Sequence, residues 1–218
     1  MLCTLLLSAT TSEGHVVARN FVQYLVSGEY PPEREEVDRS LILRGNPGNW
    51  ASAQWSDGMS ERERSGVEDC CFGQGHGFFE WVLPLAGADV SPARRIRVLC
   101  EVSSRRIDTP QTDDDIFPTT LQMFLNDVRV YGSLIRNHPH DTRGALSYLR
   151  GGLGAYGYLA HAFAESETLA AIAAHARQTG ELRLRCVVPE DAIAKGGLTI
   201  YGAECGRFPV GPTVIIEW

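Results

Sequence analysis

Residues 181–188 read ELRLRCVV, and this stretch decides the fold class. Apolar and charged side chains alternate strictly along it, which is typical of a β-strand with one buried and one solvated face. The inward phase holds Leu182, Leu184, Cys186 and Val188, whereas Arg183 and Arg185 take the outward phase. A half-buried strand of this kind favours an antiparallel sheet packed on a core.

Similar strand patterns recur along the chain, at residues 77–85, 95–102, 120–130, 198–201 and 213–218. Turn chemistry at Asn126-Asp127 divides the third of these into a hairpin. Residues 166–178 instead carry apolar side chains at helical spacing, with Ser166 as a candidate cap and Gly180 as a stop signal. We therefore expect an all-β, antiparallel β-sandwich of the jelly-roll type with one short inserted helix.

The N-terminal part predicts a separate organisation. Residues 1–28 contain two strand-like runs, Leu2–Ser8 and His15–Val26, joined by a turn-forming TSEG sequence. Two strands do not form a stable unit alone, so we expect a docked hairpin or the end of a preceding domain. The charged, proline-containing segment 29–43 is predicted to be a linker, and the main domain is expected over 44–218.

Charge and hydropathy exclude some partners. The formal net charge is −7 and no basic stripe is present, which argues against a nucleic-acid partner. No apolar run is long enough to predict a membrane span. The start of the chain lacks the basic region of a signal peptide, so none is expected, and the compartment of a parent enzyme, cytoplasmic or secreted, stays open.

The six cysteines predict neither zinc binding nor redox catalysis, because none forms a CxxC pair. Cys100 and Cys186 lie on the apolar phase of their strands. We expect them to be buried free thiols.

Familiar catalytic motifs are missing from the sequence: it contains no GxSxG, HExxH or GxxxxGK[ST]. No carboxylate pair stands out as a glycosidase couple. Asp113, Asp114 and Asp115 form an acidic run that could ligate a structural calcium ion or could simply be solvated loop charge. No other cofactor is expected.

The densest polar cluster is the segment 137–143, NHPHDTR, followed by tyrosines and glycines. Its histidines, His138 and His140, could bind a metal or transfer protons, whereas Asp141 and Arg143 could contact sugar hydroxyls or hold a structural loop. These alternatives stay open.

Aromatic side chains provide candidate sugar platforms, since a ring can stack on the C–H face of a sugar. Trp50 and Trp55 lie in a loop-rich context, where an aromatic residue is less often pure core. Trp81 lies in mid-strand and is expected in the core, and Trp218 is expected to be structural.

The order of these motifs resembles a known family. The motifs are GNWASAQWSDG (48–58), GQGHGFFEWVLPL (73–85), RRIRVLCEVSSRR (94–106), FPTTLQMFLNDVRV (117–130), HPHDTRGALSYLRGGLGAYGYLAHAF (138–163) and GGLTIYGAECGRFPVGPTVIIEW (196–218). They resemble the galactose-binding-like jelly roll in the C-terminal, non-catalytic part of some glycoside hydrolase family 2 enzymes. The run HVVARNFVQYLV (15–26) is similar to the closing strand of the Ig-like domain that precedes it there.

This resemblance implies a non-catalytic carbohydrate-binding or accessory module whose partners are a β-linked oligo- or polysaccharide and the catalytic barrel of the parent enzyme. The expected ligand contacts are Trp50, Trp55, Asp141, Arg143 and Tyr156. One alternative is a purely structural domain that supports the barrel. Another is a stand-alone polysaccharide hydrolase or lyase that uses His138, His140, Arg143 and Tyr148.

Overall fold

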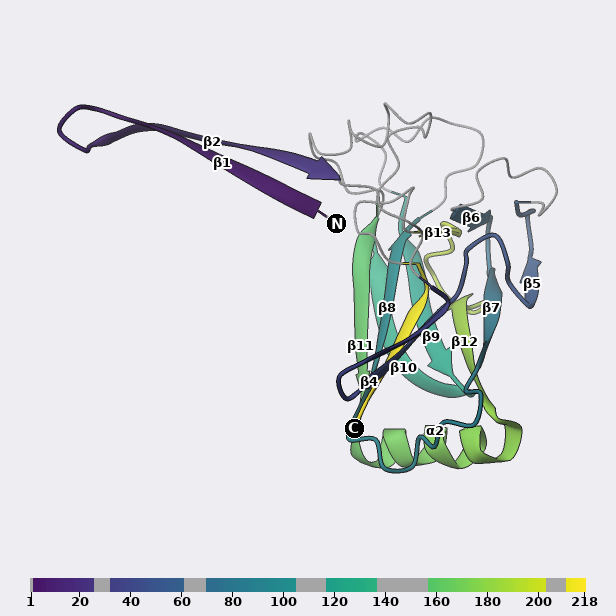
Figure 1. Cartoon of the computed structure of the whole chain (residues 1–218). Coiled ribbons are helices and arrows are strands. Elements are labelled where there is room, and N and C mark those ends of the chain that lie inside the picture. Colours follow the sequence, from purple (N-terminus) through teal and green to yellow (C-terminus); the bar gives the residue numbers. More distant parts are fainter. Residues whose placement is uncertain (1, 26–31, 61–69, 105–116, 137–156, 203–210) are drawn as a thin grey trace. The chain divides into compact units, whose positions relative to one another are not determined.

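The computed structural model describes residues 2–25, 32–60, 70–104, 117–136, 157–202 and 211–218. The chain divides into two compact units, Met1–Pro31 and Pro32–Trp218 (Figure 1). Each unit is described by itself below.

The first unit is a β-hairpin. Strand β1 (Leu2–Thr10) pairs antiparallel with β2 (Val16–Leu25), with an irregularity in register after Ala9. Gly14, at φ +86°, lies in the connecting turn, where glycine adopts the left-handed conformation at little cost. The two N-terminal strands predicted from the sequence are confirmed.

The second unit contains a five-stranded antiparallel sheet in the order β10–β9–β12–β7–β5. Its strands are β5 (Ser52–Trp55), β7 (Gly77–Pro84), β9 (Thr119–Leu125), β10 (Val128–Ile135) and β12 (Glu181–Val188). The predicted turn between β9 and β10 is present, and both of its residues, Asn126 and Asp127, have positive φ.

A seven-stranded sheet packs opposite. Its strands are β3 (Arg34–Val37), β4 (Ser40–Arg44), β6 (Cys70–Gly73), β8 (Arg95–Ser103), β11 (Tyr158–Ala164), β13 (Leu198–Tyr201) and β14 (Thr213–Glu217). Strand β8 pairs with β11 along one edge. Along its other edge it pairs first with β14 and then with β13, so the sheet forks at β8.

The hydrophobic core fills the space between the two sheets. Alternating side chains of β12 and β8 are fully buried, as the strand periodicity predicts. Phe79 is the centre of an aromatic cluster, with ring centroids 5.3 Å from Trp50, 5.1 Å from Trp55 and 6.2 Å from Trp81. The predicted all-β antiparallel sandwich is confirmed, as is the core position of Trp81.

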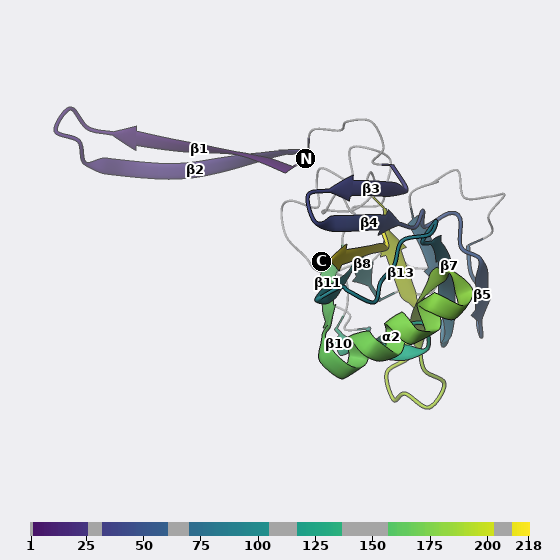
Figure 2. The ribbon, with the colours of Figure 1, turned by 60° about the horizontal axis from the view of Figure 1, so that its bottom comes forward.

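Helix α2 (Ser166–Thr179) lies across one end of the sandwich (Figure 2). Leu169, Ile172, Ala173 and Ala176 form its buried side. The prediction that Ser166 caps the helix is wrong: the capping position is Glu165, which makes no side-chain cap bond, and the Glu165 carboxylate pairs instead with Arg95. Gly180 ends the helix at φ +73°, as predicted.

The predicted linker differs from the structure. Strand β3 and most of β4 lie within residues 29–43, and β4 pairs with β14 over Ser40–Arg44. The second unit therefore begins at Pro32 rather than near residue 44. This short edge strand carries charged residues such as Glu35 and Glu36, which are also typical of linker sequence.

Among the described residues, no helix has the length and apolar character that crossing a membrane requires.

Candidate functional site

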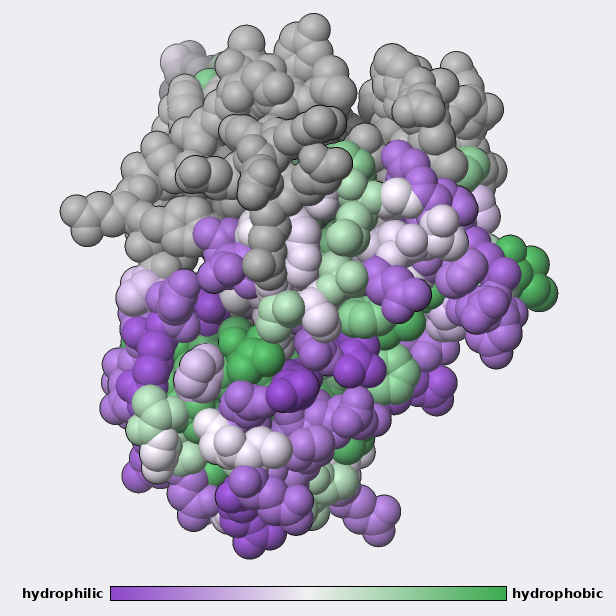
Figure 3. Space-filling model, turned by 90° about the vertical axis from the view of Figure 1, so that its right-hand side faces the viewer, coloured by the Kyte–Doolittle hydropathy of each residue, from purple (hydrophilic) through white to green (hydrophobic). Residues whose placement is uncertain are grey.

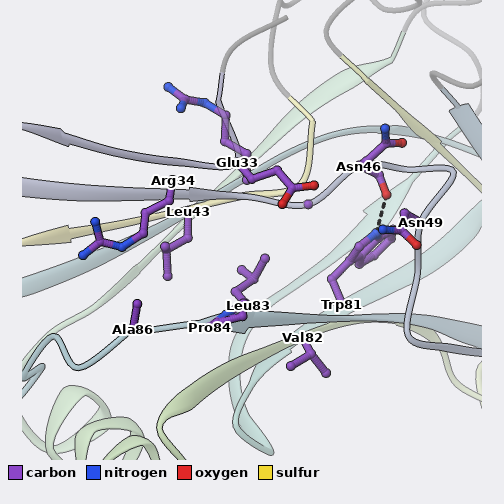
Figure 4. A pocket seen from close by; sticks show the side chains of 12 residues that line it. Glu33, Arg34, Leu43, Asn46, Asn49, Trp81, Val82, Leu83, Pro84 and Ala86 are labelled. Carbon is purple, nitrogen blue, oxygen red and sulfur yellow. Dashed lines mark hydrogen bonds between the residues drawn. The ribbon is translucent and has the colours of Figure 1, made fainter.

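A cleft of about 220 Å³ opens between β4 of one sheet and β7 of the other (Figure 4). Leu43, Leu83 and Pro84 give it an apolar lining beside the Trp81 ring. Polar and charged side chains complete the lining, namely Glu33, Arg34, Arg44, Asn46 and Asn49. The cleft thus combines an apolar floor with hydrogen-bonding groups, which is the usual make-up of a small-ligand site.

The turn after β4 is fixed against the floor of the cleft. The indole N–H of Trp81 donates to the backbone carbonyl of Asn46 at 2.8 Å. Within the turn, the Asn46 side-chain oxygen accepts from the backbone N–H of Gly48 at 2.8 Å. Gly45 permits this packing, because a Cβ there would lie 2.8 Å from the Trp81 ring. The turn is therefore held by β7 before any ligand arrives.

The two arginines of the cleft are already committed to other groups. Arg34 pairs with Glu36 at 2.6 Å. Arg44 pairs with Glu35 at 2.7 Å and donates to the carbonyl of Pro32 at 2.9 Å. Their charges are neutralised by neighbours, so they offer little to an anionic ligand.

Two other polar side chains are uncommitted. Within the described part of the chain, the carboxylate of Glu33 and the amide of Asn49 make no hydrogen bond or ion pair, and both residues are exposed. A carboxylate accepts hydrogen bonds and an amide both donates and accepts them. Together they can bind adjacent hydroxyl groups of an uncharged ligand.

The outer face of the five-stranded sheet carries a second polar arrangement. Glu80 on β7 has a side chain only 7% exposed, and its carboxylate accepts from Arg185 at 2.5 and 2.7 Å. Arg183 approaches it at 3.8 Å, and the hydroxyl of Ser52 donates to it at 3.3 Å. The guanidinium of Arg185 also lies 5.3 Å from the centre of the Phe78 ring. All charges of this cluster are paired.

The predicted stacking role of Trp50 does not agree with its position. Trp50 is 5% exposed and packs on Phe79, so its predicted exposure is wrong. Trp55 is half-buried, and its ring lies so close to Gly73 that a Cβ there would be 2.0 Å away. As a ligand contact, Trp55 stays a prediction.

The remaining predicted site residues lie outside the described part of the chain. These are Asp141, Arg143 and Tyr156, the alternative set His138, His140 and Tyr148, and the possible calcium ligands Asp113, Asp114 and Asp115. They stay predictions. Among the described residues, no three side chains of His, Cys, Asp or Glu gather as a metal site would require.

The buried cysteines agree with the sequence-based expectation. Cys71, Cys100 and Cys186 are buried and form no disulfide, with 4.0 Å between the sulfur atoms of Cys100 and Cys186. The contact with Cys186, together with burial, raises the pKa of the Cys100 thiol well above its ordinary value. Burial likewise raises the pKa of Cys71. Protonated, enclosed thiols are poor nucleophiles, which favours a structural role.

Sequence reasoning missed both uncommitted groups of the cleft. Glu33 falls in the segment predicted to be a linker, and Asn49 directly precedes the tryptophan that drew attention instead. The signal that could have identified Asn49 is the sequence GNPGN at 45–49, a tight turn that follows a strand and presents two amides.

Comparisons with known proteins identify no relative. The chain matches no model of a known protein family, and no curated protein matches its sequence.

Proposed function

We propose that this protein is a non-catalytic carbohydrate-binding or accessory module that binds an uncharged, β-linked sugar in the cleft between β4 and β7. The observation that carries the proposal is the pair Glu33 and Asn49, uncommitted at the opening of a cleft whose floor is apolar. A sugar would place hydroxyl groups on this pair and part of its apolar C–H face on the exposed Pro84 and Ala86, since Leu43, Leu83 and Trp81 are at most 4% exposed.

The size of the cleft narrows the ligand. Sites for drug-sized ligands usually measure about 300–1,000 Å³, whereas this cleft measures about 220 Å³. It therefore suits one terminal sugar ring rather than a longer oligosaccharide. The committed arginines argue against a uronate, because each guanidinium already has a carboxylate partner.

A sandwich of this kind fits an accessory role beside a catalytic domain. The family resemblance of the motif order supports the same context, in which the parent enzyme acts on β-linked sugars. The module would hold the chain end of the substrate near the catalytic domain. It would raise the effective concentration of the substrate there and would cleave no bond itself.

Titration calorimetry with the disaccharides mannobiose, galactobiose and cellobiose tests the proposal. We expect at least one to bind with a dissociation constant of about 1 mM or tighter. Glu33→Gln and Asn49→Ala should each weaken that binding about tenfold. The first replaces a charged acceptor with a weaker neutral one, and the second removes an amide that would bond a hydroxyl group.

The matched control is Glu190→Gln. Glu190 is exposed, as Glu33 is, but does not line the cleft, so this variant should bind as the wild type does. If no disaccharide binds at protein concentrations near millimolar, the proposal fails and a purely structural domain becomes the better explanation.

A further inference from the structure

We propose that the outer face of the five-stranded sheet is a second glycan-binding surface, which holds an extended, uncharged polysaccharide chain across the strands. The class of ligand in this inference rests on the proposed carbohydrate binding. The surface itself is separate from the cleft.

The strand register sets five side-chain positions in line across all five strands. Gln54 pairs with Phe78, Phe78 with Val187, Val187 with Gln122, and Gln122 with Gly132. Paired residues of antiparallel strands point to the same face. That face is the outer one, because the neighbours Phe79, Cys186 and Met123 are buried inside. We call this line the uncharged row.

The uncharged row combines the two kinds of contact that a sugar chain needs. Phe78 and Val187 form a half-buried apolar centre for sugar C–H groups, with the Arg185 guanidinium 5.3 Å from the centre of the Phe78 ring. Gln54 and Gln122 flank this centre with amides that can bind hydroxyl groups. Gly132 at the end of the row has open space where a Cβ would lie, with no atom within 4 Å. The surface is thus accessible to a chain that runs past the edge strand.

A parallel line of residues borders the uncharged row. It runs through Ser52, Glu80, Arg185, Phe124 and Arg129, again in register. On this face Arg183 and Arg185 form ion pairs with the three carboxylates of Glu80, Glu181 and Asp127, and Arg129 adds a third positive charge. A face without net charge complements an uncharged ligand and gives no field that would attract an anion.

The distribution of apolar residues argues against a protein partner. Figure 3 shows the side of the domain that carries β5 and β7, where hydrophobic and hydrophilic residues are interleaved rather than gathered into one patch. A protein interface of standard size would place a contiguous apolar centre there. Five strands span about 19 Å from edge to edge, which is room for several sugar rings in line.

Affinity electrophoresis in gels that contain linear β-mannan, β-galactan or β-glucan tests this inference. We expect the full chain to be retarded by at least one of them and not by alginate, which carries a carboxylate on each sugar. Phe78→Ala and Gln122→Ala should each weaken retardation about tenfold, because the first removes an apolar contact with sugar C–H groups and the second a hydrogen bond to a hydroxyl group. Circular dichroism establishes that the variants are folded, and Gln122→Ala removes no buried group.

Two controls separate this surface from the cleft. Phe163→Ala removes a phenylalanine that is 51% exposed on β11 of the other sheet, and it should leave retardation unchanged. Phe78→Ala and Gln122→Ala should leave disaccharide binding in calorimetry unchanged, whereas Asn49→Ala should weaken it.

The outcomes are distinguishable. If both face variants are retarded like the wild type while disaccharides still bind, the sheet surface is not a glycan site and the cleft proposal stands alone. If sedimentation shows self-association that Phe78→Ala abolishes, the face belongs to a second copy of the chain and the inference is overturned. If neither disaccharides nor polymers bind, both proposals fail together.

Discussion

Gly45 allows the turn after β4 to pack closely on Trp81 beside the cleft. Gly45 packs so closely on the Trp81 ring that an alanine Cβ would lie 2.8 Å from its Cδ1 atom. Since Trp81 is 2% exposed and anchored to Asn46, the ring has little room to move away. We expect Gly45→Ala to lower the free energy of unfolding by about 1–3 kcal/mol through overpacking and to weaken disaccharide binding by displacing the turn. Urea denaturation and calorimetry check the two effects.

The carboxylate of Glu80 is the most costly charge to remove on the sheet surface. Its replacement by an amide would leave Arg185 and Arg183 without the carboxylate they share, although both are partly exposed and keep a second carboxylate, Asp127 and Glu181 respectively. We expect Glu80→Gln to reduce the free energy of unfolding by about 1–2 kcal/mol, less than for a deeply buried pair. Glu36→Gln, which affects an exposed pair, should cost less in the same denaturation experiment. Equal losses for the two variants would show that burial of Glu80 has no energetic effect.

The buried thiols predict how stability depends on pH. The folded state raises the pKa of Cys71 and Cys100, so it retains their protons at a pH where the unfolded chain releases them. Their contribution to stability is full below the unfolded pKa of about 8.5 and is lost as pH rises through the folded pKa. Urea midpoints should therefore fall above about pH 8.5. They should fall less steeply in a Cys71→Ala/Cys100→Ala variant, and an equal slope would contradict this explanation.

At the scale of elements, helix α2 depends on its C-terminal glycine. Gly180 has φ +73°, and no atom lies within 4 Å of a Cβ built there. An alanine would therefore clash with nothing, but the left-handed backbone conformation would be unfavourable for it. We expect Gly180→Ala to lower the free energy of unfolding by about 1 kcal/mol. Gly132→Ala is the matched control, since that glycine also faces open space but has no positive φ. It should leave the urea midpoint nearly unchanged.

Elements with strict alternation were predictable from the sequence, and others were not. Strands β12 and β13 begin and end where the pattern predicts, and the β9–β10 turn follows its Asn-Asp signal. Strand β11 was not predicted, because its buried residues are small and a large apolar residue is exposed. Ala160 and Ala162 point inward, while the larger Phe163 is exposed. Short strands such as β5 and β6 offer too few residues for a period to be recognised.

The cleft could not be predicted from the spacing of residues along the sequence. Glu33 and Asn49 line the same cleft because β3 folds back on β4 and the following turn packs on Trp81. These are long-range contacts that local periodicity does not encode. The sequence predicted aromatic contacts at Trp50 and Trp55, but Trp50 belongs to the core, and no amide was among the predicted contacts.

At the scale of the whole molecule, the second unit has a self-sufficient core and two candidate sugar surfaces. Among the described residues, those of the buried hydrophobic core run from Leu41 to Ile216. The cleft suits a chain end, and the sheet face suits a chain interior. A module with both would hold one polysaccharide at two points, which strengthens binding without a new kind of contact.

The most direct test of sugar binding in the cleft is the indole N–H resonance of Trp81 during titration with the disaccharide that binds most tightly. The Trp81 ring lines the cleft, and its N–H donates to Asn46 in the turn that the sugar would contact. We expect the Trp81 resonance and the backbone amides of residues 46–49 to shift together and to saturate with one dissociation constant, while the indole resonance of buried Trp50 stays in place. Saturating binding that leaves the Trp81 resonance and these amides unmoved would contradict the account.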